Sequence, residues 1–517
     1  MAIAPSMAET QLLSGPPIGK LAPLRPHPQL YEINALAWLH RLGQQMGRRV
    51  TLSQAPNAEW ERLRGLGFDV IYLMGVWKRS PAGQRLSRSE TSLFPRFDQC
   101  LPGWTLEDVA GSPFSIQGYE PDPGIGSWQE LDALHRSLNK LGMRLVLDFI
   151  PNHTGPDHPW VREHPEYYIH GTLEQYRAAA SHFFVTEDAN ANPQILACGR
   201  DPNFAPWSDT AQLNYFDPEL RLAMIAQLRR IAEFCDGVRC DMAMLILNDA
   251  FHQNWEEMLG AADPPEKEFW QEAIAAIPDF LWIAEAYNDS EWALQQLGFN
   301  FTYDKRLYDR LREGFVPDIA LHLKADWEFQ SRSARFLENH DEERAAAAFG
   351  KSHLPAVAVL GCTIPGMHFL QDGQLEGMRT QLVVQLSHAQ NEFPDTETRR
   401  MYERILQIAN DDVFHSGNWK LLTVLDSGDH TNSDLIGYYW QVGNQIRLVV
   451  VNLGGSISAG RVYLPNQWFK GDTLLFEDLL DGATYPRKVA DLQRWGLFVK
   501  KDAFGAHILK AAISNKQ

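Results

Sequence analysis

Short apolar runs alternate with amphipathic helical stretches over most of the chain. YEINAL is an apolar run typical of a strand, NAEWERLRGLG has helical spacing and ends in glycine, and FDVIYLMGVW reads as a second strand. A further helical stretch, SWQELDALHRSLNKLGM, ends at a glycine and is followed by the buried strand RLVLDFI. Alternation of this kind predicts a parallel sheet covered by helices.

Eight apolar runs of strand type precede residue 420. In chain order they contain Tyr31, Val70, Val146, Val238, Ile283, Phe301, Phe336 and His368. Eight parallel strands with helices outside them make a (β/α)₈ barrel. We therefore expect an α/β protein built on a TIM barrel.

Two regions depart from this alternation. Residues 153–219 are rich in Pro, His, Asp and Asn, which indicates a short insertion domain after strand three. Residues 421–517 show alternating strands joined by Gly-Asn turns, which predicts a C-terminal antiparallel β-sandwich domain. The barrel then comprises residues 28–152 and 220–420, preceded by a proline-rich N-terminal extension, residues 1–27.

Charge and hydropathy argue against a nucleic-acid-binding protein and against a membrane-spanning protein. The 47 basic and 65 acidic residues give a net charge of -18, so the surface repels phosphate backbones and nucleic acid is excluded as a partner. No apolar stretch reaches the ~18 residues that a membrane helix needs, and no secretory signal pattern opens the chain. The five Cys show no metal-type spacing. We expect a cytoplasmic protein with reduced thiols, and the oligomeric state stays open.

Four short motifs follow predicted strands at the end where barrel enzymes carry their catalytic groups. They are Asp148-Phe-Ile-Pro-Asn152-His153 on strand three, Gly237-Val-Arg239-Cys-Asp241 on strand four, Ile283-Ala-Glu285-Ala-Tyr287 on strand five and Glu338-Asn339-His340-Asp341 on strand seven. Each alone is explained by a turn or a local salt bridge. All four at the ends of the right strands predict one shared site.

The carboxylates of this site differ in their expected surroundings. Side chains alternate along a strand, so Arg239 and Asp241 share a face, and the guanidinium is expected to lower the pKa of Asp241 and keep it ionised. Glu285 stands among apolar neighbours, which should raise its pKa as a general acid needs. Such a pair cleaves glycosidic bonds, and adjacent strands can bring it within the roughly 5 Å that implies retention. Asp341 is a third carboxylate that can stabilise the transition state.

With these motifs in this order, the sequence resembles the α-amylase family, glycoside hydrolase family 13. DFIPNH, GVRCD, IAEAY and ENHD match its four signature regions, and TAQLN looks like its fifth. PGMHFLQDG resembles its eighth strand, although Gln374 stands where many members have Glu. The resemblance covers most of residues 30–517.

The resemblance implies a role for each site residue. Asp241 would form the covalent glycosyl-enzyme, Glu285 would be the acid/base and Asp341 would stabilise the transition state. Contacts to the cleaved sugar would come from His153, Arg239 and His340, while Asp148 and Asn152 would support the site. In SPFSIQGY, Phe114 would replace the usual Tyr that stacks on the sugar, with Tyr119 as the alternative.

One departure from the family pattern bears on substrate and cofactor. Many α-amylases follow the nucleophile with Lys-His, the Lys binding a leaving-group sugar and the His carbonyl helping to hold calcium. Here Met244 and Leu245 stand there, and we expect both to pack. No cofactor is therefore expected to be required; calcium, if bound, would use Asn152.

The sequence leaves three functions open. The first is a retaining hydrolase of α-1,4-glucans or malto-oligosaccharides. The second keeps the triad but transfers the glycosyl or maltosyl unit to an acceptor other than water. The third is an inactive amylase-like binding subunit, which the presence of all three carboxylates disfavours.

Overall fold

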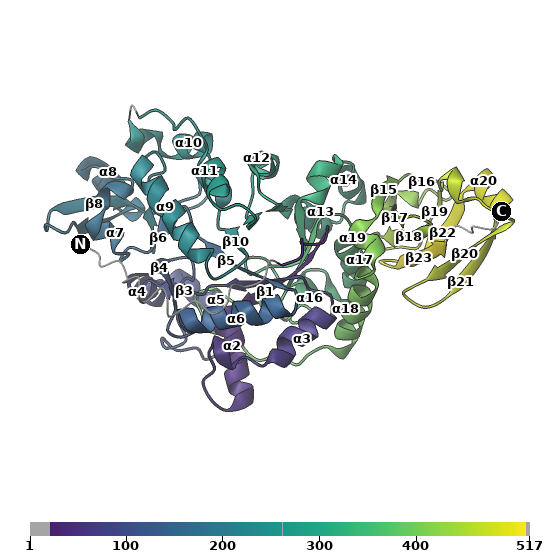
Figure 1. Ribbon diagram of the computed structural model, residues 1–517, viewed down its shortest axis with the longest axis horizontal. Helices are drawn as coiled ribbons and strands as arrows, with labels where there is room; N and C mark the ends of the chain where they lie inside the picture. Colours follow the sequence, from purple (N-terminus) through teal and green to yellow (C-terminus); the bar gives the residue numbers. More distant parts are fainter. Residues whose placement is uncertain (1–20, 261, 513–517) are drawn as a thin grey trace.

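The computed structural model describes residues 21–260 and 262–512. Eight parallel strands close into a barrel in the order β1-β14-β13-β12-β11-β10-β5-β2 (Figure 1). They are β1 (Gln29–Asn34), β2 (Val70–Met74), β5 (Arg144–Phe149), β10 (Gly237–Cys240), β11 (Leu281–Ala284), β12 (Phe301–Tyr303), β13 (Ser333–Phe336) and β14 (Met367–Gln371). Each contains its predicted residue, so the TIM barrel is confirmed.

Helices cover the outside of the barrel. The longer ones are α2 (Ala35–Met46), α6 (Trp128–Lys140), α9 (Pro218–Ile231), α10 (Asn248–Leu259), α17 (Gly350–Thr363) and α18 (Thr396–Ala409). The predicted helix after residue 126 is α6, which Ser127 and Glu130 begin with a reciprocal capping box. Gly142 follows its end at φ +74°, the left-handed conformation that glycine adopts readily. Every residue of β2 is buried, as expected for a strand covered on both faces.

An insertion follows β5, as the sequence predicts. It holds two short antiparallel pairs, β6 (His153–Thr154) with β9 (Ala211–Gln212) and β7 (Phe183–Glu187) with β8 (Pro193–Ala197). The β6–β9 register places His153 opposite Gln212. The insertion is thereby joined to the carboxyl end of barrel strand β5.

The C-terminal region is an antiparallel β domain at the far end of the molecule (Figure 1). One sheet has β15 (Asn418–Leu422), β17 (Leu435–Val442), β18 (Gln445–Asn452), β23 (Ala506–Ala512), β20 (Thr473–Asp478) and β21 (Thr484–Lys488). The other has β16 (Val424–Leu425), β19 (Ser458–Val462) and β22 (Leu497–Lys501). Leu448 and Val450 of the first sheet share an apolar core with Val462 and Val499 of the second, as in a sandwich.

The end of the predicted N-terminal extension packs against the folded body, whereas residues 1–20 lie outside the described part. Arg25 forms an ion pair with Asp69 at 2.7 Å. The buried His27 lies edge-on to Trp440 of the C-terminal domain, with ring centroids 5.0 Å apart.

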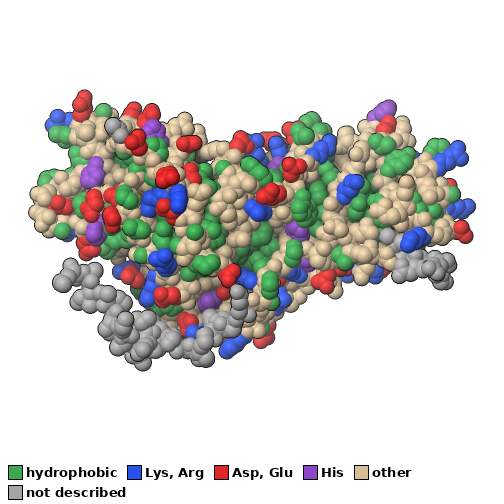
Figure 2. All heavy atoms as spheres, turned by 45° about the horizontal axis from the view of Figure 1, so that its top comes forward, with side chains coloured by type: hydrophobic (Ala, Val, Ile, Leu, Met, Phe, Trp, Pro, Cys, Tyr) green, Lys and Arg blue, Asp and Glu red, His purple; other side chains and the backbone are tan. Residues whose placement is uncertain are grey.

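On the surface, acidic and basic side chains are interspersed over the face in Figure 2. Among the described helices, none combines the length and apolarity required to cross a bilayer.

Candidate active site

Arg239 lies at the centre of the predicted constellation. Its Nη1 is 2.8 Å from Asp241 Oδ1 and its Nη2 is 2.8 Å from Glu285 Oε2, while Asp148 Oδ1 is 3.7 Å from Nη1. The barrel produces this arrangement because β10 lies between β5 and β11, with Arg239 in register with Asp148 on one side. All four side chains are buried. Three of the four motifs therefore meet at one guanidinium.

The pKa of Asp241 differs from the expectation. Burial raises it, and repulsion from Asp148 adds to the rise, although Arg239 acts in the opposite direction. The prediction of a lowered pKa was wrong because desolvation of a fully enclosed carboxylate outweighs one guanidinium. Since Asp241 and Glu285 share Arg239, the two carboxyls titrate as a pair.

The pKa of Glu285 is raised by burial, the direction the sequence predicts. Its surroundings are more polar than the apolar strand suggests. Glu285 Oε2 accepts a hydrogen bond from Met242 N at 2.6 Å, and Glu285 Oε1 accepts one from the Tyr287 hydroxyl at 2.8 Å. Both carboxylate oxygens are thus held in place. Met242 has φ +43°, a strained turn directly after Asp241.

The fourth motif lies in the loop beyond β13 and reaches the site through His340. His340 Nδ1 is 2.6 Å from Glu32 Oε1, and its Nε2 is 3.1 Å from Asp341 Oδ2. Burial alone would lower the pKa of His340, but the two carboxylates raise it well above its usual value. The Asp341 side chain is 45% exposed, so the partial loss of solvent that opposes its ionisation is outweighed by the charged His340, which lowers the pKa of Asp341 to about 2. Asp341 is therefore ionised beside a charged imidazole.

Of the two aromatic candidates, Phe114 lies against the site. Its ring stacks on that of His340 with centroids 5.3 Å apart, and Arg239 Cζ is 5.1 Å from its centroid. Tyr119 instead uses its hydroxyl on the backbone, accepting from Ile150 N at 2.9 Å and donating to Ile150 O at 3.0 Å. The geometry favours Phe114 as the ring facing substrate and gives Tyr119 a supporting role.

His153 is buried at the start of the insertion. Burial lowers its pKa to about 4, so the imidazole is neutral at pH 7. Its ring lies 5.3 Å from that of Trp207, which comes from the insertion. A neutral imidazole can donate one hydrogen bond to a sugar hydroxyl and accept another.

The catalytic-domain model of the α-amylase family, described as "Alpha amylase, catalytic domain", matches residues 60–421. That span is more than two thirds of the chain. The chain belongs to the α-amylase family. The resemblance carried by the four motifs is thereby confirmed.

Relatives and solved structures agree with this family. Alpha-amylase 3 of Dictyoglomus thermophilum is 24% identical over 285 residues, 50% of this chain and 52% of that protein. A maltose-1-phosphate maltosyltransferase of Rhodospirillum rubrum is 31% identical over 257 residues, 47% of this chain and 30% of that protein. The chain thus spans about half or less of these relatives. The maltogenic alpha-amylase AmyB from Thermotoga neapolitana has the same fold, with TM-score 0.67, 20% identity and coverage of 94% and 99%.

The calcium that many family members bind does not fit the residues present here. Asn152 Oδ1 accepts a hydrogen bond from Gln212 Nε2 at 3.0 Å, and the same nitrogen donates to Asn152 O at 2.9 Å. The side-chain amide of Gln212 therefore occupies the oxygens that a cation would use. Within residues 21–260 and 262–512, no cluster of three or more His, Cys, Asp or Glu side chains is arranged to hold a metal.

Asp148 supports the site. Its Oδ1 accepts from the Tyr72 hydroxyl at 2.5 Å and its Oδ2 from Gly75 N at 2.7 Å. Met244 and Leu245 are buried in the apolar core within a 3-10 turn, as predicted from their replacing the family's Lys-His pair. The side chains just beyond Asp241 therefore present no polar group to a leaving sugar.

Sequence reasoning missed three contacts of the candidate site residues. Glu32 lies in the first strand, and its contact with His340 was not predicted. A carboxylate inside an apolar run is nevertheless a signal that the group has a specific partner. Tyr287 stood two residues beyond Glu285 and so on the same face, which strand alternation could have indicated. Trp207 gave no local signal, because only the folded insertion brings it to His153.

Proposed function

We propose that the protein is a retaining α-glycosidase acting on α-1,4-linked glucans or malto-oligosaccharides through a covalent glycosyl-enzyme. One observation carries the proposal: the guanidinium of Arg239 contacts both Asp241 and Glu285 at 2.8 Å. Two carboxylates within reach of one guanidinium suit the short separation of retaining enzymes, roughly 5–5.5 Å. The family and its named relatives support the substrate class.

In the first step, a carboxylate oxygen of Asp241 attacks the anomeric carbon of the donor sugar. Glu285, kept protonated by its raised pKa, gives its proton to the glycosidic oxygen, and the bond to the leaving sugar breaks. Arg239 orients both groups. Asp341 and the charged His340 bind the hydroxyls of the ring that gains positive charge.

In the second step, Glu285 takes a proton from water, and the resulting hydroxide displaces Asp241 from the anomeric carbon. The configuration at that carbon is inverted twice and so retained. Tyr287 and Met242 N hold the two oxygens of Glu285 in position for both proton transfers.

A second candidate function is transfer of the glycosyl or maltosyl unit to a sugar or phosphate acceptor. It is favoured by the buried, apolar Met244 and Leu245, which leave the acceptor side without the family's Lys. Relatives named as α-1,4-glucan:maltose-1-phosphate maltosyltransferases also support it; that of Streptomyces coelicolor is 33% identical over 110 residues, 21% of this chain and 15% of that protein. The same triad serves both reactions, since only the attacking group differs.

A substrate panel separates these functions. The protein is incubated separately with soluble starch, maltoheptaose, maltose, trehalose, sucrose and maltose 1-phosphate, and products are separated by chromatography. Hydrolysis gives only shorter sugars, whereas transfer gives longer or isomerised ones. Turnover of none of the six would contradict both and favour the inactive binding subunit.

We also propose a cytoplasmic location. Cys100, Cys198, Cys235, Cys240 and Cys362 are all free and buried. Unpaired buried thiols suit a reducing compartment. Fractionation of the producing cells, with the chain followed by immunoblot, tests the location; recovery in the culture medium would contradict it.

A further inference from the structure

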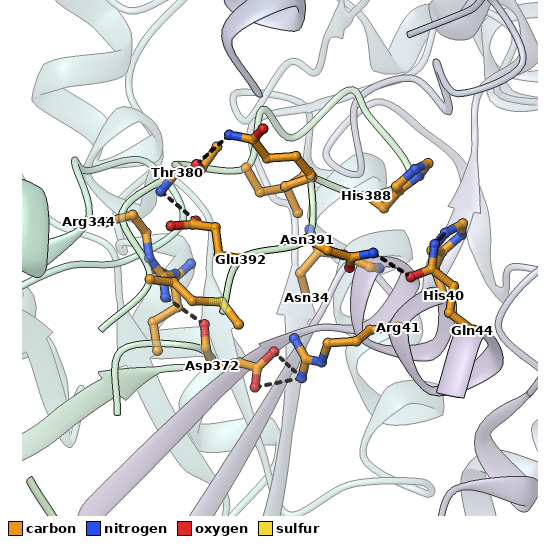
Figure 3. Close-up of a pocket in the computed structure, with 16 residues that line it drawn as sticks. Asn34, His40, Arg41, Gln44, Arg344, Asp372, Thr380, His388, Asn391 and Glu392 are labelled. Atoms are coloured by element: carbon orange, nitrogen blue, oxygen red, sulfur yellow. Dashed lines mark hydrogen bonds and ion pairs between the residues drawn. The ribbon is translucent and has the colours of Figure 1, made fainter. Parts of the chain in front are cut away.

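A polar cavity lies at the end of the barrel where the carboxylates gather, lined by the ends of β1 and β14 and by other segments than the catalytic motifs. It encloses about 120 Å³ where β1 and β14 end, between helix α2 and the segment 378–392 (Figure 3). A buried water needs ~10–15 Å³ of such space, so the cavity holds roughly eight waters. That room suits one pyranose ring rather than an oligosaccharide.

Both arginines of the cavity wall are already paired with carboxylates. Arg41 pairs with Asp372 at 2.8 Å, and Arg344 pairs with Glu338 at 3.1 Å. Glu392 accepts hydrogen bonds from the backbone, including one from Thr380 N at 2.8 Å. A charged ligand such as phosphate would have to compete for guanidinium groups that carboxylates hold. The wall therefore favours a neutral ligand.

Polar groups nevertheless remain to recognise hydroxyls. Arg41 and Gln390 line the cavity with a guanidinium and an amide. Gln44 and Asn391 add amides, joined by one hydrogen bond of 3.1 Å (Figure 3). Guanidinium, amide and carboxylate groups around a small cavity match the alternating donors and acceptors of a sugar's hydroxyls.

The edge of the cavity also carries a flat pair of rings. His40 and His388 stack with centroids 3.9 Å apart and an interplanar angle of 7°. Burial lowers the pKa of both imidazoles, so the pair is neutral at pH 7 and adds no charge.

The cavity shares a wall with the catalytic centre. Thr380 and Leu382 line the cavity, whereas Gln381 between them donates from Nε2 to Asp341 O at 2.8 Å. An occupant that fixes this segment would also fix the backbone of Asp341.

We propose that this cavity is a second saccharide site, which takes a single neutral pyranose such as D-glucose and orders the segment 378–392. Binding here does not depend on the proposed glycosidase activity. Only its consequence for Asp341 rests on that function.

Hydrogen–deuterium exchange of the full-length Asp241→Asn variant tests the proposal without turnover. Peptides within 378–392 are expected to exchange at least twofold more slowly in saturating D-glucose. Adding Ala37→Leu fills the cavity with a side chain from α2 and should abolish the protection. The matched control is Gln45→Leu, an exposed position of the same helix outside the cavity wall, where protection should persist.

Gln44→Ala provides a second test if Ala37→Leu lowers the melting temperature. It removes one wall amide at an exposed position and should weaken glucose binding at least fivefold. If glucose protects the 378–392 peptides equally in all variants, the sugar binds elsewhere and the proposal is wrong. The proposal is also wrong if glucose protects these peptides in none of the variants. Protection of these peptides by inorganic phosphate but not by glucose would show that the cavity binds an anion and not a neutral sugar.

Discussion

The two sides of the catalytic centre are built from opposite kinds of residue. On the bond-breaking side, Arg239, Asp241 and Glu285 are ionisable groups buried together, which desolvation makes costly. On the leaving-group side, the next turn of chain, residues 243–246, is apolar and buried. Burying Met and Leu stabilises a fold, whereas burying carboxylates does not.

This difference separates the residues that the proposed reaction requires from the residues that only pack. In the proposed mechanism, the ionisable groups persist against their cost because bond cleavage needs them. The apolar turn offers nothing that selects a sugar, so selectivity must come from neighbouring segments. Trp207 of the insertion lies beside His153, and we propose it as one such group.

Neutralising the nucleophile should have the largest effect on the bond-breaking side. Asp241→Asn is expected to lower kcat about 10⁴-fold, the scale seen when a catalytic carboxylate loses its charge. Steady-state rates on the substrate found in the panel measure it. Asp217→Asn, a helix cap that Asn also fills, is the control. Near-wild-type rates in Asp241→Asn would remove Asp241 from its role.

Arg239→Lys should have the next largest effect. An ammonium group cannot contact Asp241 and Glu285 in the fork geometry of a guanidinium, so kcat/KM should fall about 10²-fold. The control is Arg221→Lys, a buried arginine paired with Glu272 away from the site. If both variants lose activity equally, the loss reflects folding rather than the bridge.

Tyr287→Phe should change the pH dependence of kcat/KM more than its maximum value. The Tyr287 hydroxyl donates to Glu285 Oε1, which favours the ionised carboxylate. Removing that hydrogen bond should raise the pKa of Glu285, and since Glu285 must be protonated to act, the alkaline limb of kcat/KM should move to higher pH. We expect a shift of about one pH unit or less, with Tyr215→Phe unchanged. A shift to lower pH would contradict the assigned hydrogen bond.

Gln212→Ala tests the junction between the insertion and the barrel, next to the catalytic motifs. Its amide joins the insertion to Asn152, so the free energy of unfolding should fall by about 1–3 kcal/mol. In the unmodified protein, EDTA should leave the melting temperature unchanged within a degree or so. A large fall in melting temperature with EDTA, reversed by calcium, would show that a cation stabilises this junction.

The sequence predicts the barrel and most of the site because its signals are local. Strand runs mark each barrel strand, and Arg239, Asp241 and Glu285 lie at or next to strand ends, where barrel geometry must bring them together. The sign of the pKa shift of Asp241 is not predictable in this way, because it depends on burial by distant segments. The pairs Glu32–His340 and Gln212–Asn152 join residues far apart in the chain, so no local pattern indicates them.

In the proposed mechanism, Asp241 forms a covalent bond to the donor sugar. A fluorinated glycosyl fluoride that forms the intermediate quickly and releases it slowly tests it most directly, with the adduct located by peptide mass spectrometry. The account predicts one added glycosyl mass, on the peptide that contains Asp241. An adduct on the Glu285 peptide, or none while the protein still turns over its substrate, would contradict it.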